Sequence, residues 1–261
     1  MAYVSPTLTL IVGAVKKAAS ALGRDFNELE HLQNSVRSDK GFAQHAYDKV
    51  QKILQEELSK IKAGLPIITS DKDSIPASGT YFTLCAIDGF DNFAHGHADF
   101  AVSVALIENG KVIDGVVYSP ITDEMFFAEK GCGAFKEGFR NHERLRVASA
   151  KNADKVLFAC NTDTRVINNV LSLTKNVRIS GASALDLAYL SAGKIDATAV
   201  SAAFIGKIAA GVLLVKEAGG YVFEIGQTDV RSENLEKTLS SGNLFATNEP
   251  LRQKIAEILA K

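Results

Sequence analysis

The feature that most constrains the fold is a series of short apolar runs in residues 67–128, separated by Gly, Asn and Asp. Short apolar runs between turn-forming residues are typical of β-strands. Asn109-Gly110 separates two of the runs, and this pair is a strong signal for a two-residue hairpin turn. The predicted strands are residues 67–68, 81–87, 100–107, 111–118 and 124–128. Residues 130–138, with three glycines, are predicted to form a loop.

Apolar residues recur at helical spacing before these strands, over residues 5–22 and 41–62. The second half of the chain contains both segments with helical spacing and short apolar runs typical of strands. It predicts helices at 164–173, 182–192, 209–218 and 250–259, and strands at 156–160, 177–179, 195–200, 221–225 and 244–246. Helices and strands therefore alternate, which predicts a layered α/β (α+β) architecture. We expect two tightly joined subdomains, residues 1–150 and 151–261.

Charge and cysteine content limit the partners that such a chain would have. The 261 residues carry 29 Lys and Arg against 30 Asp and Glu, a balance that argues against direct binding to nucleic acid or to an anionic membrane. The three cysteines form no CxxC pair, so neither a disulfide framework nor a structural zinc site is indicated, and a reducing cytoplasm fits best. The apolar stretch at residues 8–15 is too short to span a bilayer.

The segment that carries the clearest chemistry begins where the strand at residues 81–87 ends. Ile87, Asp88 and Gly89 lead from that strand into a helix start. This arrangement places a carboxylate beside exposed backbone N–H groups. Carboxylate oxygens suit Mg²⁺, and the N-terminus of a helix suits a phosphate.

Residues 87–96, IDGFDNFAHG, resemble the DPIDGTxNFxHG signature of the inositol monophosphatase family, which includes a bacterial extragenic-suppressor branch. Matching blocks cover nearly the whole chain and include residues 119–124, 129–135, 181–189 and 209–220. The resemblance implies a layered αβαβα sandwich and a Mg²⁺-dependent phosphomonoesterase. In such an enzyme, carboxylates hold two or three metal ions that activate a water. A homodimer is implied as well.

Carried over residue by residue, the family's site is largely replaced in this chain. Asp88 keeps one metal-binding aspartate, and Ile87 keeps a position whose carbonyl ligates metal. The other positions have lost the family's residue: Tyr47, Cys85 and Lys207 stand for aspartates, Ser70 (beside Asp71) and Val200 for glutamates, Phe90 for the water-activating threonine, and Gly206 for a tryptophan.

These replacements predict that the magnesium mechanism is impaired. A pair of Mg²⁺ ions needs several anionic oxygens at about 2.1 Å, and one carboxylate does not supply them. The ammonium of Lys207 would also repel a cation. Two unit charges at about 4 Å interact by about 4 kcal/mol at an effective dielectric constant of 20, and a dication doubles this repulsion. We therefore expect no metal cofactor, although the family implies Mg²⁺.

The remaining charged groups have several alternative interpretations. Asp88 is either an N-cap of the following helix, an ion-pair partner of Lys207, or part of an anion site formed with Gly89, Phe90 and Lys207. Two other metal sites are conceivable: a transition-metal site at Cys85, Asp88, His95 and His97, or a rearranged magnesium site that includes Asp71, Asp73 and Asp91.

The leading functional hypothesis is a catalytically impaired pseudo-phosphatase that binds a small anionic ligand or a protein partner. One alternative is an active Mg²⁺-dependent phosphatase for inositol-1-phosphate or a related sugar phosphate, with rearranged metal ligands. Another, which the resemblance to the suppressor branch implies, is a partner-binding regulator of RNA synthesis or processing.

Overall fold

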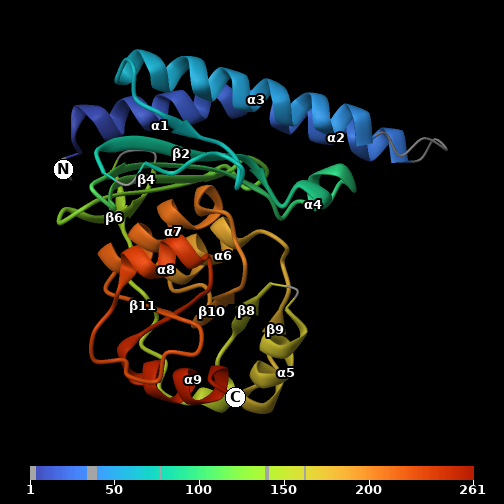
Figure 1. The fold of residues 1–261 in the computed structure, drawn as a ribbon. Helices are drawn as coiled ribbons and strands as arrows, with labels where there is room; N and C mark the ends of the chain where they lie inside the picture. The colour runs from blue at the N-terminus through green and yellow to red at the C-terminus, as the bar shows by residue number, and fades with distance from the viewer. Residues whose placement is uncertain (1–3, 34–39, 77, 139–140, 162) are drawn as a thin grey trace.

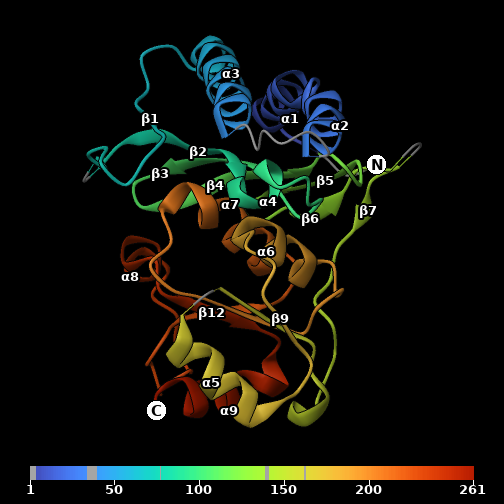
Figure 2. The same cartoon turned by 90° about the vertical axis from the view of Figure 1, so that its right-hand side faces the viewer.

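The chain folds into five alternating layers, as the resemblance implied (Figure 1). This computed structural model describes residues 4–33, 40–76, 78–138, 141–161 and 163–261, with the side chains of residues 30–33 and 40 left out. The N-terminal helices cover one face of a first sheet, central helices lie between this sheet and a second one, and further helices cover the far face of the second sheet (Figures 1 and 2). The predicted αβαβα sandwich is confirmed.

The first layer consists of helices α1 (Pro6–Ala19), α2 (Leu22–Gln33) and α3 (Lys40–Ile61). Ser5 caps α1 by accepting a hydrogen bond from the Leu8 N–H, and Pro6 occupies the first helical position. Helix α2 was not predicted. Its apolar residues Leu22, Phe26 and Leu29 are buried in the core under the helices, but polar residues dominate the rest of its sequence.

The first sheet has the strand order β1-β2-β3-β4-β5-β6-β7. β1 pairs in parallel with β2, and every other neighbouring pair is antiparallel. Its strands are β1 (Ile67–Ile68), β2 (Thr80–Asp88), β3 (Ala101–Glu108), β4 (Lys111–Ser119), β5 (Glu124–Glu129), β6 (Gly133–Lys136) and β7 (Glu143–Arg144). The hairpin at Asn109-Gly110 is confirmed, with a positive φ at both residues. The prediction of a loop at residues 130–138 was wrong in part, because β6 lies within it.

The second sheet has the order β11-β12-β10-β8-β9. Its strands are β8 (Phe158–Cys160), β9 (Val177–Arg178), β10 (Ala197–Val200), β11 (Tyr221–Glu224) and β12 (Leu244–Thr247). The helices of this half are α5 (Thr164–Leu173), α6 (Ser183–Ser191), α7 (Ile205–Glu217), α8 (Leu235–Ser241) and α9 (Arg252–Leu259). Helix α8 was not predicted. No helix in the described part of the chain is long and apolar enough to cross a bilayer.

Helices α6 and α7 form the central layer, and one hydrophobic core joins them to both sheets (Figure 2). Leu187 and Leu214 of these helices are fully buried in this core together with Phe126 of the first sheet and Leu244 of the second. The close contact between α7 and β4 requires glycine at position 115, because a Cβ there would lie 2.9 Å from the Ala210 Cα. The two sheets fall on either side of residue 150, and the division into two subdomains stays a prediction.

Candidate functional site

Strand β2 ends at Asp88, whose side chain is directed to the start of α6. Gly89 follows with φ 81°, and a Cβ at this position would lie 2.6 Å from the Asp99 carbonyl oxygen, so only glycine fits. Asp88 is 1% exposed, and its Oδ2 accepts a hydrogen bond of 2.7 Å from the Ala184 N–H. The prediction that Asp88 caps the following short helix, α4 (Phe90–Ala94), was wrong. The cap residue of α4 is Gly89, and Asp88 instead binds the first turn of α6.

Lys207, in the first turn of α7, forms the expected ion pair with Asp88. Its Nζ lies 3.6 Å from Asp88 Oδ1, which is too far for a hydrogen bond, and Oδ1 has no other hydrogen-bond partner among the described residues. Burial raises the pKa of the Asp88 carboxyl, although Lys207 opposes this effect. Burial by itself lowers the pKa of the Lys207 ammonium, but the negative charges of Asp88 and Asp91 outweigh this effect and raise the pKa above its ordinary value. The lysine therefore stays charged and serves as the counter-charge of Asp88.

The ion pair lines a cleft of about 910 Å³ between the first sheet and the helices of the central layer. Most of the predicted site residues meet there. Those that line the cleft are Tyr47, Ser70, Asp71, Cys85, Asp88, Gly89, Phe90 and Lys207. Ile87 and Val200 do not line it, because their side chains are buried in the two hydrophobic cores, each at 1% exposure.

The side chains that replace the family's aspartates do not supply anionic ligands. Tyr47 packs edge-on against Phe90 with ring centroids 5.9 Å apart, and burial raises the pKa of its hydroxyl to about 12. Burial also raises the pKa of the Cys85 thiol far above its usual range, so this side chain is a neutral thiol and not a nucleophilic thiolate. Phe90 offers no hydroxyl group. The positions where aspartates were expected therefore carry an aromatic side chain, a neutral thiol and, at Lys207, a positive charge.

The other proposed ligand sets do not assemble either. His95 Nδ1 contacts the Asp91 carbonyl oxygen and His97 lies beside Asp99, and neither histidine lines the cleft. Asp73 accepts the N–H groups of Thr69 and Ser70 and so holds its own loop together. Within the described ranges, no group of three or more His, Cys, Asp and Glu side chains is placed to hold a metal ion. The residues present do not fit the magnesium ions that the fold implies.

Sequence reasoning missed Asp186, which lines the cleft from the first turn of α6. It is 6% exposed, and its Oδ2 accepts a hydrogen bond of 2.8 Å from Ser180 Oγ. Burial raises the pKa of this carboxyl to about 7, and the nearby Asp88 and Asp99 add to the effect. The sequence signal that could have identified Asp186 is its place in residues 181–189, a block that matches the family.

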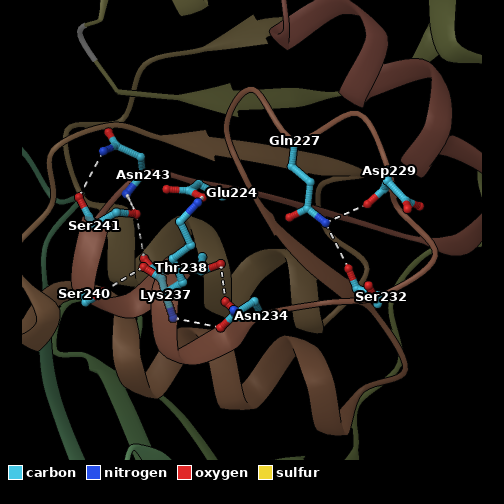
Figure 3. A network of polar contacts seen from close by, with 10 residues as sticks. All are labelled: Glu224, Gln227, Asp229, Ser232, Asn234, Lys237, Thr238, Ser240, Ser241 and Asn243. Atoms are coloured by element: carbon cyan, nitrogen blue, oxygen red, sulfur yellow. Dashed lines mark hydrogen bonds and ion pairs between the residues drawn. The ribbon is translucent and has the colours of Figure 1, made fainter.

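A second group that was missed forms the wall at the ends of β8 and β10. Asn161 follows β8, and its Nδ2 donates to the Ser201 carbonyl oxygen at 2.6 Å. Its Oδ1 is buried and has no hydrogen-bond partner in the described structure. Ala202 has φ 53°, which is uncommon for a residue with a Cβ, and its N–H donates to Asn243 Oδ1 at 2.9 Å. Asn243 is in turn held to Ser241 at the end of α8 (Figure 3).

Comparison with known proteins gives matches along the whole chain. The model of the inositol monophosphatase family matches residues 4–261. An inositol-1-monophosphatase of Mesorhizobium japonicum is 31% identical, over 98% of this chain and 97% of the relative. The Nus factor SuhB of Xylella fastidiosa is 27% identical, over 97% of this chain and 94% of the relative. The crystal structure of extragenic suppressor protein suhB from Bartonella henselae has 32% identity and a TM-score of 0.83, covering 98% of this chain and 100% of that one.

Proposed function

Because the chain belongs to the inositol monophosphatase family, we propose that it keeps the family's fold and cleft but acts by binding a small molecule rather than by metal-dependent hydrolysis. The observation that carries this proposal is the ion pair between Lys207 and Asp88 in the cleft. It puts a positive side chain beside the one carboxylate that the resemblance retains.

The electrostatics of this pair oppose metal binding. A divalent ion at Asp88 would have to displace the Lys207 ammonium or lie close to it, and the repulsion is strong in a partly buried site. Asp71 and Asp91 also line the cleft, but both are solvent-exposed, and no other described carboxylate lies with them as a ligand set. Without bound metal the family's way of activating water is not available, and Phe90 supplies no hydroxyl group to orient one.

The anion site predicted at Gly89, Phe90 and Lys207 stays a prediction. The Lys207 side chain is 43% exposed, so its ammonium can face the cleft while it pairs with Asp88. Calorimetry with inorganic phosphate tests this site directly: a saturable heat supports it, and no heat removes it.

Phosphate release from inositol-1-phosphate tests the proposed function. We expect the wild type to release no more phosphate in millimolar Mg²⁺ than D88N does. The triple variant C85D/F90T/K207D, which restores three residues of the family pattern, is the matched comparison and should gain Mg²⁺ dependence. Mg²⁺-dependent release by the wild type that D88N abolishes would instead establish the alternative of an active phosphatase with rearranged ligands.

The resemblance also leads us to expect a homodimer, and the cysteine pattern leads us to expect a cytoplasmic protein. A protein partner is expected because relatives of this chain are named Nus factor SuhB. Sedimentation velocity tests the dimer. Co-purification of the tagged protein with RNA polymerase subunits or ribosomal proteins tests the regulatory alternative. We give this alternative second place because it rests on the names of relatives, whereas the ion pair of Lys207 and Asp88 is a contact within this chain.

A further inference from the structure

We propose that the ligand of the cleft is an uncharged, polyhydroxylated molecule resembling a free sugar, and that Asn161 recognises one of its hydroxyl groups. This inference rests on the proposed function, because it assumes a cleft without metal ions. It adds the chemical class of the ligand and a binding residue that the family pattern did not point to.

The cleft contains two buried acceptors without hydrogen bonds. Asn161 Oδ1 and Asp88 Oδ1 are both inaccessible to solvent, and neither has a hydrogen-bond partner among the residues described. The Asn161 amide is fixed in orientation because its Nδ2 donates to the Ser201 carbonyl oxygen, so the oxygen has to be the free end. Asp88 Oδ1 faces the Lys207 ammonium at 3.6 Å, so Asn161 Oδ1 is the acceptor that lacks any charged or hydrogen-bonding partner among the described residues. Buried acceptors are normally satisfied, and the group that satisfies Asn161 Oδ1 has to be a donor. Hydroxyl groups of a ligand meet this requirement.

The wall that holds Asn161 is rigidly built. Ala202 keeps its positive φ because its N–H is bound to Asn243 Oδ1, and the Ala203 N–H donates to the Gly242 carbonyl oxygen at 3.0 Å. Gly242 fits tightly there, since a Cβ would lie 2.2 Å from the Ala203 oxygen. Figure 3 shows how Asn243 and Ser241 continue into the polar network of α8. An unfavourable backbone conformation that its neighbours maintain beside a cleft is typical of a ligand-binding position.

The charges in the cleft disfavour a phosphate. Lys207 is the one Lys, Arg or His among the described lining residues, and Asp88 already balances it. The remaining acidic side chains, Asp71, Asp91 and Asp186, give the lining negative charge, with Asp186 partly protonated near neutral pH. An uncharged ligand avoids this repulsion, whereas a phosphate dianion does not.

The remaining lining residues suit the faces of a sugar ring. Phe90, Phe204 and Ile179 contribute apolar surface, and Ile179 is 49% exposed. Ser183 adds a hydroxyl group to the lining. Apolar surface combined with a few oriented polar groups is the usual composition of a small-molecule site.

Calorimetry on the wild-type protein with matched pairs of probes tests the proposal. The pairs are glucose with glucose 6-phosphate, and myo-inositol with inositol-1-phosphate. We expect at least one free polyol to bind at millimolar concentration, and its phosphate ester to bind about tenfold more weakly because of the negative lining. Tighter binding of the esters, or no binding of either free polyol, would overturn the inference.

Asn161→Ala is the test of the residue, and Asn168→Ala, at an exposed position of α5, is its control. The first variant should lose at least about fivefold in polyol affinity, the size expected when one hydrogen bond to a ligand is removed. The second should bind like the wild type. Equal affinity of both variants would contradict the role of Asn161, and the wild-type comparison remains decisive should Asn161→Ala fail to fold. Phosphate released from the esters is measured in the same samples. Release would contradict the proposed function, whereas the affinities of the free polyols test the further inference.

Discussion

Lys207 and Asp88 form an ion pair whose two members differ in their access to water. The Asp88 side chain is 1% exposed, whereas that of Lys207 is 43% exposed. When Lys207 is removed, water cannot reach the buried carboxylate to replace the lost counter-charge. When the charge of Asp88 is removed, water can hydrate the half-exposed ammonium. The contribution of the pair to stability is therefore asymmetric.

We predict that K207M is more destabilising than D88N. At about pH 8, K207M should lower the free energy of unfolding by about 1–3 kcal/mol, a value reduced from that of fully buried pairs because water reaches Lys207. D88N should cost less, since its amide oxygen can still accept the Ala184 N–H. The folded-state pKa of Asp88 is raised, so the protein loses stability as the pH rises and the carboxyl ionises. Without Lys207 the loss of stability becomes larger, because Lys207 is the charge that favours the carboxylate. Denaturant unfolding of both variants at acidic and alkaline pH measures the effect, and a larger loss for D88N at about pH 8 would contradict it.

Asp186 provides a separate pH dependence. Its pKa is 3.8 in an unfolded chain and about 7 in the folded protein, so the folded state binds the proton more tightly. Its contribution to stability is fully present below the unfolded pKa and is lost as the pH rises through the folded pKa, a change of about 4 kcal/mol over this range. D186N cannot ionise and should therefore gain stability relative to the wild type between about pH 5 and pH 8. A stability difference that does not change with pH would show that the carboxyl titrates normally.

At the scale of elements, the first turn of α7 lies directly against the middle of β2. A Cβ at Gly206 would come within 2.4 Å of the Leu84 carbonyl oxygen, which is a backbone atom and cannot turn aside. The resemblance places a tryptophan at this position. In this chain the contact leaves room for glycine only, and it fixes the first turn of the helix that carries Lys207.

The substitution Gly206→Ala should lower the stability by about 1–3 kcal/mol through overpacking. Gly13→Ala is the matched control, because Gly13 lies in α1 and a Cβ there meets nothing within 4 Å. The control should be neutral or stabilising by up to about 1 kcal/mol, from the better helix propensity of alanine. Thermal unfolding of both variants measures the contrast, and equal effects would contradict the close contact.

The elements also show which features can be predicted from sequence. The hairpin at Asn109-Gly110 and the helix of residues 41–62 are specified by local signals, namely a turn pair and an apolar stripe, and both are present. Helix α2 escaped prediction because its short stripe of Leu22, Phe26 and Leu29 lies among polar residues. Its stability comes from contacts such as the one between Phe26 and Phe100, whose ring centroids lie 5.8 Å apart.

At the scale of the whole molecule, the two sheets share the core layer of α6 and α7. We predict that the chain unfolds in one transition even though it was expected to contain two subdomains, because either half alone would expose this layer. Far-ultraviolet and near-ultraviolet circular dichroism should therefore report the same midpoint. Two separated midpoints would show that residues 1–150 and 151–261 are independent units.

Part of the candidate site could be predicted from the sequence, and the missed part depends on how distant segments are arranged in the whole molecule. The ion pair of Asp88 and Lys207 was expected because the resemblance aligns both residues with positions that meet in one site. Asn161 was not expected, because its contact with Ser201 depends on the adjacent placement of β8 and β10 in the second sheet. Strand order of this kind is not determined by periodicity within a single segment.

Binding of Mn²⁺, followed by electron paramagnetic resonance, tests most directly whether an ammonium has replaced the metal ions of this cleft. The spectrum of the free ion should persist when the wild-type protein is added at millimolar concentration. It should diminish with C85D/K207D, which adds two carboxylates beside Asp88 and removes the positive charge. Saturable binding of Mn²⁺ to the wild type that D88N abolishes would contradict the account.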